Sequence, residues 1–192
     1  MGHDGGMDAA VVTGIVLAAG AGRRAGGPKA LRRDADGTPW VELAVRRLRA
    51  IGCGRVLVVL GAGADDARRL VPPQAGIVVA EDWEDGMSAS LCAGLAAATG
   101  VAALVTLVDL PEEPAAVGAR VVAAAPPGPE ALARAVHDGR PGHPVLIGRA
   151  HWAAIRAEVH GDSGARDHLE EHGALAVECG DLADGRDHDG PA

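Results

Sequence analysis

Four short apolar segments alternate with segments of helical pattern through the first part of the chain. The apolar segments cover residues 11–17, 55–60, 77–80 and 103–108, and helices are expected over residues 38–51, 65–71 and 88–98. Strands that are buried on both faces form nearly continuous apolar runs, and only Thr13, Arg55 and Thr106 are polar in these segments. The alternation therefore predicts an α/β fold whose mostly parallel sheet carries helices on both faces.

The second half of the chain is less regular. Strands at 132–136 and 144–147 flank an expected turn at 138–142, helices follow near 150–159 and 165–172, and a strand follows near 174–179. There is no internal repeat and no second apolar core. Residues 1–192 are therefore expected to form a single domain, with a polar leader at 1–10 and an acidic tail at 181–192.

Four loops follow the carboxyl ends of the expected parallel strands, which is where such sheets bind ligands. They cover residues 20–29, 61–63, 81–87 and 109–111. The first loop combines four glycines with Arg23, Arg24 and Lys29. Glycines let backbone N–H groups approach a ligand closely, and the cations can neutralise its charge. The loop predicts a site for the phosphate tail of a nucleotide, and a solvated basic loop is the alternative.

Two other nucleotide-binding motifs fit this loop less well. Residues 20–25 match the dinucleotide fingerprint G-x-G-x-x-[G/A], but Gly26, Gly27 and Pro28 would break the helix that the fingerprint requires. A Walker P-loop needs Gly-Lys-Ser/Thr, whereas Lys29 stands between a proline and an alanine.

The charge and cysteine content argue against several classes of protein. The net charge of −8 is unlike that of a nucleic-acid-binding protein. Three cysteines without metal-ligand spacing favour a reducing cytoplasm, and no apolar run is long enough to cross a membrane. A cytoplasmic protein without nucleic-acid or membrane partners is expected. The histidines at 151, 160, 168 and 172 show no metal spacing and are expected at the surface.

Five segments, in order, resemble motifs of the MobA-like NTP transferases, and most closely those of the MocA-type molybdenum cofactor cytidylyltransferases. The first, L-A-A-G-x-G-x-R-x-G-x-P-K, runs from Leu17 to Lys29 and has Ala25 where Met is usual. The others are W-E-D-G-M-S-A-S-L at 83–91, L-V-D-L-P at 107–111 with Leu110 in place of Gln, G-R-P-G-H-P-V-L at 139–146, and G-D-S-G-A-R at 161–166.

The resemblance implies a Rossmann-like three-layer α/β/α sandwich and the transfer of CMP from CTP to the phosphate of molybdopterin, with release of pyrophosphate. GTP is the alternative nucleotide. A molybdenum hydroxylase or its chaperone is an expected partner. Together with the loops that face the expected cleft, the resemblance supplies the candidate binding residues Leu17, Ala18, Ala19, Gly20, Gly22, Gly61, Gly86, Ser88, Ser90, His143, Asp162 and Arg166.

Several of these residues also have a simpler structural interpretation. Ser88 fits a helix N-cap, since it begins an expected helix. His143 precedes a proline and could be structural, and Asp162 and Arg166 could form an internal ion pair.

The candidate catalytic residues are Arg24, Lys29 and Asp109. Arg24 and Lys29 are expected to contact the phosphoryl oxygens on which charge develops. Asp109 closes the fourth strand and is expected to bind Mg²⁺ or Mn²⁺, although a turn or helix cap would also explain it. The resemblance implies a second metal ligand within D-H-D-G-P at 187–191, where Asp189 is preferred to Asp187. An acidic disordered tail is the alternative there.

Three other functions stay open. A transferase could act on another phosphorylated acceptor. The departures at Ala25 and Leu110 are compatible with a non-catalytic, cofactor-binding chaperone of a molybdoenzyme. The partial fingerprint match leaves an NAD-dependent enzyme as the third class.

Overall fold

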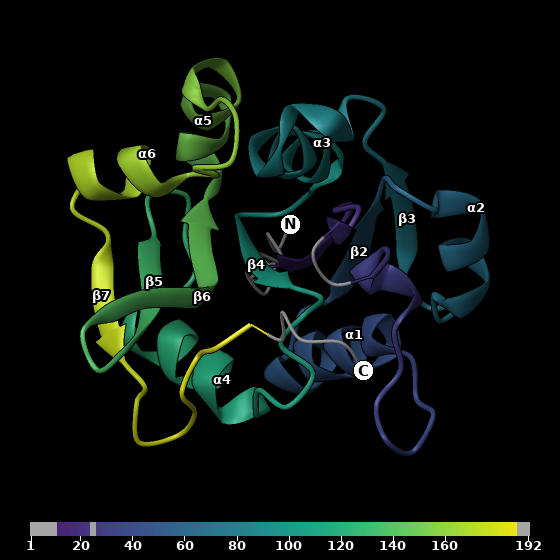
Figure 1. The fold of residues 1–192 in the computed structure, drawn as a ribbon. Helices are drawn as coiled ribbons and strands as arrows, with labels where there is room; N and C mark the ends of the chain where they lie inside the picture. Colours follow the sequence, from purple (N-terminus) through teal and green to yellow (C-terminus); the bar gives the residue numbers. More distant parts are fainter. Residues whose placement is uncertain (1–10, 24–25, 188–192) are drawn as a thin grey trace, which may run out of the picture.

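The computed structural model describes residues 11–23 and 26–187, and they build a seven-stranded sheet between two layers of helices (Figure 1). The strands are β1 (Val12–Ala18), β2 (Arg55–Leu60), β3 (Gly76–Val79), β4 (Ala102–Leu107), β5 (Leu132–His137), β6 (Arg140–Gly148) and β7 (Leu175–Glu178). The helices are α1 (Trp40–Ile51), α2 (Ala64–Ala67), α3 (Met87–Ala97), α4 (Ala115–Ala124), α5 (Trp152–Glu158) and α6 (Arg166–Glu171).

The strand order is β3-β2-β1-β4-β6-β5-β7. Strands β3, β2, β1 and β4 run parallel to one another, β6 is antiparallel to both β4 and β5, and β7 is parallel to β5. The predicted α/β class with a mostly parallel, Rossmann-like sheet is therefore confirmed. The antiparallel strand follows from the short β5–β6 hairpin, which turns at Asp138 and Gly139 with φ of 51° and 74°.

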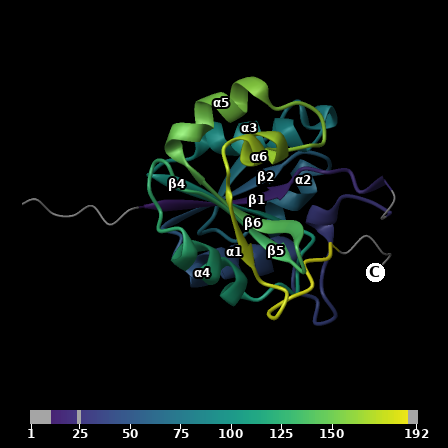
Figure 2. The same cartoon turned by 90° about the vertical axis from the view of Figure 1, so that its left-hand side faces the viewer.

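The core lies on both faces of the sheet, because successive side chains of a strand point to opposite faces. Helices α1 and α4 cover one face, where Val16 of β1 packs, and α3, α5 and α6 cover the other, where Ile15 and Leu17 pack (Figure 2). The strands are largely apolar because helices cover both faces of the sheet.

Helix α4 was not predicted from the sequence. It consists of alanine, valine, glycine and a single arginine, so it lacks the polar face that marks an amphipathic helix. Its buried residues are Val117, Gly118 and Val121. The expected helix at 65–71 is also shorter: α2 passes into a 3₁₀ turn at Arg68–Leu70, before the prolines at 72 and 73.

No helix within the described residues has the length and apolar character needed to cross a membrane.

Candidate active site

A cleft of about 560 Å³ opens at the carboxyl ends of β1 and β4. Its volume lies within the range usual for small-molecule and nucleotide sites. The first loop and the ends of both strands meet there, as the sequence predicts. It is lined by Leu17, Ala18, Ala19, Gly20, Ala21, Gly22, Arg23, Lys29, Trp83, Glu84, Gly86, Met87, Ser90, Leu107, Val108, Asp109 and Asp162.

A hydrogen bond joins the two described parts of the glycine-rich loop. The N–H of Gly27 donates to the carbonyl of Gly22 over 3.1 Å. A side chain at Gly22 would lie 2.0 Å from the carbonyl oxygen of Gly27, and its φ of +55° also favours glycine. The loop returns the chain to the end of β1, where Pro28 precedes a 3₁₀ helix over Lys29–Leu31. Arg24 and Ala25 lie outside the described residues.

Lys29 and Asp109 are in direct contact in this cleft. Lys29 Nζ lies 2.6 Å from Asp109 Oδ2, and the two side chains are 17% and 11% exposed. Residues 80 positions apart in the sequence are brought together because the first loop returns to the end of β4. The alternative of a freely solvated basic loop therefore does not hold for Lys29.

The N-terminus of α3 is covered by the loop at 161–164. The N–H of Met87 donates to Asp162 Oδ1 over 3.3 Å, and the N–H of Ser88 donates to the carbonyl of Gly161 over 2.9 Å. The expected N-cap at Ser88 is wrong: Gly86 is the N-cap, and the Ser88 hydroxyl is buried without a partner among the described residues. The loop that covers the helix supplies the hydrogen-bond acceptors instead.

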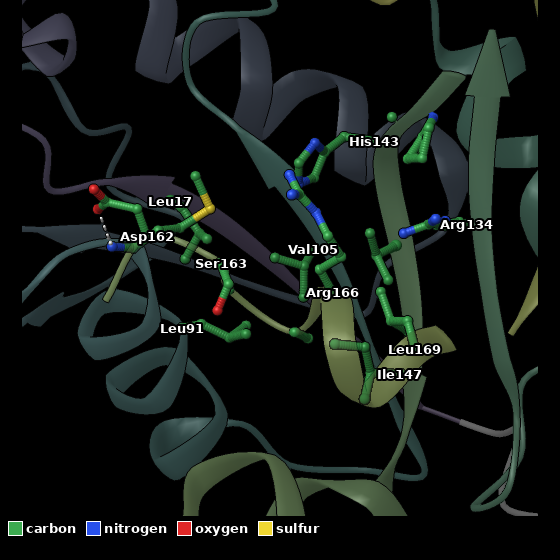
Figure 3. A pocket seen from close by; sticks show the side chains of 16 residues that line it. Leu17, Leu91, Val105, Arg134, His143, Ile147, Asp162, Ser163, Arg166 and Leu169 are labelled. Atoms are coloured by element: carbon green, nitrogen blue, oxygen red, sulfur yellow. Dashed lines mark hydrogen bonds between the residues drawn. The ribbon is translucent and has the colours of Figure 1, made fainter. Parts of the chain in front are cut away.

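A smaller pocket of about 150 Å³ adjoins the cleft and shares Leu17, Met87 and Asp162 with it (Figure 3). Its floor is apolar, with Leu91, Val105, Ile147 and Leu169 among the lining side chains. Polar side chains on its wall come from β5, β6 and α6: Arg134, His143 and Arg166. The side chains of His143 and Arg166 point toward each other in Figure 3.

His143 is neutral at neutral pH. Desolvation lowers its pKa to about 4, against the attraction of Asp109, which raises it, while Arg134 and His137 lower it further. An uncharged imidazole can both donate and accept a hydrogen bond. The alternative of an internal ion pair between Asp162 and Arg166 is not found among the ion pairs of the described residues.

Not every candidate residue lines one of these two cavities. A side chain at Gly61 would come within 2.6 Å of Trp83 Cβ and 2.8 Å of Ala19 Cβ, so its backbone is already enclosed by protein. Asp189 lies outside the described residues, and Asp187 is exposed and lines neither cavity.

The described part of the acidic tail is attached to the fold. Arg120 donates to both carboxylate oxygens of Asp181 over 2.5 and 2.9 Å, and His137 Nδ1 lies 2.8 Å from the carbonyl of Ala183. The alternative of a disordered tail concerned residues 187–191, and all of these except Asp187 lie outside the described residues.

The expectation that the later histidines are all at the surface is wrong for His168. His160 is exposed, but His168 is buried between His151 and His172, with His168 Nε2 3.0 Å from His151 Nδ1 and the ring stacked 3.9 Å from that of His172. Packing of α6 against the turn before α5 brings these rings together. Among the described residues, no group of three or more His, Cys, Asp or Glu side chains is arranged to hold a metal ion.

Sequence reasoning missed two buried or half-buried arginines near the site. Arg134 of β5 lines the smaller pocket and lies 3.7 Å from Glu170. Arg47 of α1 contacts the loop that follows Asp109. The residues that Arg134 and Arg47 contact are distant from them in the sequence. Only the apolar residues next to each arginine could have indicated that it is buried.

Comparison with known proteins agrees with the fold. A family model described as MobA-like NTP transferase domain matches residues 14–176. The chain belongs to this family, and it is a nucleotidyltransferase by class.

Three known proteins are similar to this chain. Nicotine blue oxidoreductase of Paenarthrobacter nicotinovorans is 38% identical over 96% of this chain and 95% of its own length. The crystal structure of an Rv0371c homologue from Mycobacterium sp. strain JC1 has a TM-score of 0.77 at 27% identity, over 93% of this chain and 90% of that one. The structure of Rv0371c from Mycobacterium tuberculosis in complex with manganese has a TM-score of 0.70 at 23% identity, over 88% and 87%.

Proposed function

We propose that the protein transfers CMP from CTP to the phosphate of molybdenum cofactor and releases pyrophosphate. The observation that carries the proposal is the contact between Lys29 and Asp109 inside a cleft walled by the glycine-rich loop. Lys29 supplies a positive charge for the phosphates of a nucleotide, and Asp109 supplies a carboxylate for the metal ion bound to them. Both follow the carboxyl ends of adjacent parallel strands. The choice of CTP depends on the L-A-A-G and P-K residues of the first loop.

The residues fit a divalent metal ion whose remaining ligands come from the nucleotide. Mg²⁺ is usually bound by one or two carboxylates together with phosphate oxygens and water, and Asp109 offers one carboxylate in the cleft. Mg²⁺ or Mn²⁺ would neutralise charge on the reacting phosphates when bound. The manganese complex of Rv0371c supports the assignment of a divalent ion to this fold.

In this proposal the chain binds and orients the two substrates. The backbone of Ala18, Ala19, Gly20 and Gly22 lies against the base and sugar, and Lys29 donates to phosphoryl oxygens as charge develops on them. The acceptor occupies the smaller pocket, where the apolar floor contacts a flat ring. Arg166 there attracts the acceptor's phosphate, and the neutral His143 can form a hydrogen bond with it.

The test is release of pyrophosphate from each of CTP, GTP, ATP and UTP, with Mg²⁺ and molybdenum cofactor present. The proposal expects CTP to be the preferred substrate, and Asp109→Asn to abolish the reaction. Release with GTP alone would contradict the choice of base. Cofactor binding without turnover, unchanged in Asp109→Ala, would instead support a non-catalytic chaperone.

The 38% identical relative favours a second candidate function, which is oxidoreduction. The cleft would then hold a nucleotide redox cofactor in place of a triphosphate. Oxidation of NADH or NADPH by the protein in the presence of an oxidised dye tests this candidate. Steady oxidation of NADH or NADPH, with no release of pyrophosphate from any nucleotide, would favour oxidoreduction over nucleotidyl transfer.

A further inference from the structure

Arg47 is a buried arginine on α1 whose side chain reaches the loop after β4. Its Nη1 donates to the carbonyl of Leu110 over 2.5 Å and to the carbonyl of Glu113 over 3.1 Å. Its Nε also lies 3.6 Å from Glu113 Oε2, and the two side chains are only 5% and 4% exposed. One side chain therefore holds both ends of the segment 110–113.

Stabilisation of the fold does not by itself explain the buried ion pair between Arg47 and Glu113. Removing two charges from water is costly, and apolar side chains of similar size often stabilise such a position equally well or better. Burial raises the pKa of Glu113 to about 7, although Arg47 and His137 both lower it. Glu113 Oε1 and Arg47 Nη2 have no hydrogen-bond partner among the described residues. The two carbonyl contacts are what an apolar replacement could not provide.

The segment held by Arg47 begins at the residue after Asp109. On the other side of Asp109, the N–H of Val108 donates to the carbonyl of Leu17 over 3.1 Å. Asp109 is therefore the single residue between two anchored neighbours, one fixed to β1 and the other to α1. Fixing both neighbours limits the rotation of the Asp109 backbone, and so the direction of its carboxylate.

We propose that Arg47 is a positioning residue, which aims the Asp109 carboxylate at the metal–nucleotide complex by holding the carbonyls of Leu110 and Glu113. This inference rests on the proposed function, since it takes Asp109 to be the metal ligand. Residues that orient a metal ligand typically change metal affinity by about 10- to 100-fold when they are replaced.

The test compares Arg47→Met, the double variant Arg47→Met/Glu113→Leu, and the control Arg46→Met. Arg46 precedes Arg47 in α1, but it is exposed and pairs with Glu42. Arg47→Met leaves a buried carboxylate and can fail to fold, whereas the double variant removes both charges. Mn²⁺ affinity in the presence of CTP is measured by electron paramagnetic resonance, together with the midpoint of thermal unfolding.

The double variant is expected to unfold cooperatively, as the wild type does, but to bind Mn²⁺–CTP about 10- to 100-fold more weakly. Arg46→Met is expected to bind as the wild type does. A double variant that is folded and binds Mn²⁺–CTP with wild-type affinity would overturn the inference, because Arg47 would then serve stability only. The variant Asp109→Asn separates a failure of this inference from a failure of the proposed function. If Asp109→Asn also binds Mn²⁺–CTP with wild-type affinity, Asp109 is not the metal ligand, and the inference about Arg47 fails with it.

Discussion

Replacement of Lys29 by methionine tests the cation of the cleft with little change in side-chain volume. In the structure Lys29 Nζ is 2.6 Å from Asp109 Oδ2, and both side chains are mostly shielded from solvent. At an effective dielectric constant of about 20, the Lys29 ammonium would interact by about 4 kcal/mol with a unit of negative charge about 4 Å away on the reacting phosphate. Loss of one donor to a developing oxyanion typically costs about 3–4 kcal/mol, or 10²- to 10³-fold in kcat. Both arguments give the same size of effect.

The effect of Lys29→Met on folding is expected to be much smaller. A partly exposed ion pair contributes about 1 kcal/mol, which corresponds to a change of about 2–4 °C in Tm for a chain of this length. The assay is pyrophosphate release at saturating CTP and cofactor, with Tm from calorimetry. Arg33→Met is the matched control, because Arg33 is exposed and donates to the carbonyl of Gly37 over 2.8 Å. A kcat of Lys29→Met within twofold of the wild type would refute the reasoning.

Two further predictions concern the loop and the cleft wall. Gly22→Ala places a methyl group against the carbonyl of Gly27 at a φ of +55°. The affinity for CTP, measured by calorimetry, should therefore fall at least about tenfold. The control is Gly128→Ala, which should bind CTP as the wild type does because nothing lies within 4 Å of the added methyl group. Because His143 has a pKa of about 4 in the folded protein against 6.5 ordinarily, only the unfolded chain takes up its proton as the pH falls through this range. Stability should therefore fall by up to about 3 kcal/mol between pH 6.5 and 4, and urea unfolding of His143→Gln should lack that decline; an unchanged slope would contradict the assignment.

The parts of the fold that were predictable share one physical cause. Strands β1, β2 and β4 are largely apolar because both faces of the sheet are covered, and this pattern is visible without a structure. The end of helix α1 was also predictable. Its expected range ended at residue 51, and the helix ends there because Gly52 adopts a left-handed conformation with a φ of 103°. Helix α4 was not, because its composition shows neither a polar face nor a capping side chain.

The candidate site was predictable where neighbouring strand ends meet and not where distant segments interact. Lys29 and Asp109 follow strands β1 and β4, which are adjacent in the sheet, so the rule for parallel sheets places them together. The N-terminus of α3 is covered by residues 161–162, more than 70 positions away, and Arg47 contacts carbonyls 63 and 66 positions away. Carbonyl oxygens carry no sequence signal, so such contacts need coordinates.

The central claim is that one cleft holds the metal–nucleotide complex between the glycine-rich loop and the end of β4. The most direct measurement is a crystal structure of the protein grown with CTP and Mg²⁺. We expect the metal ion on the carboxylate of Asp109 and the triphosphate within reach of Lys29 Nζ. A nucleotide bound elsewhere, with the contact between Lys29 and Asp109 undisturbed and no metal ion on that carboxylate, would contradict the account.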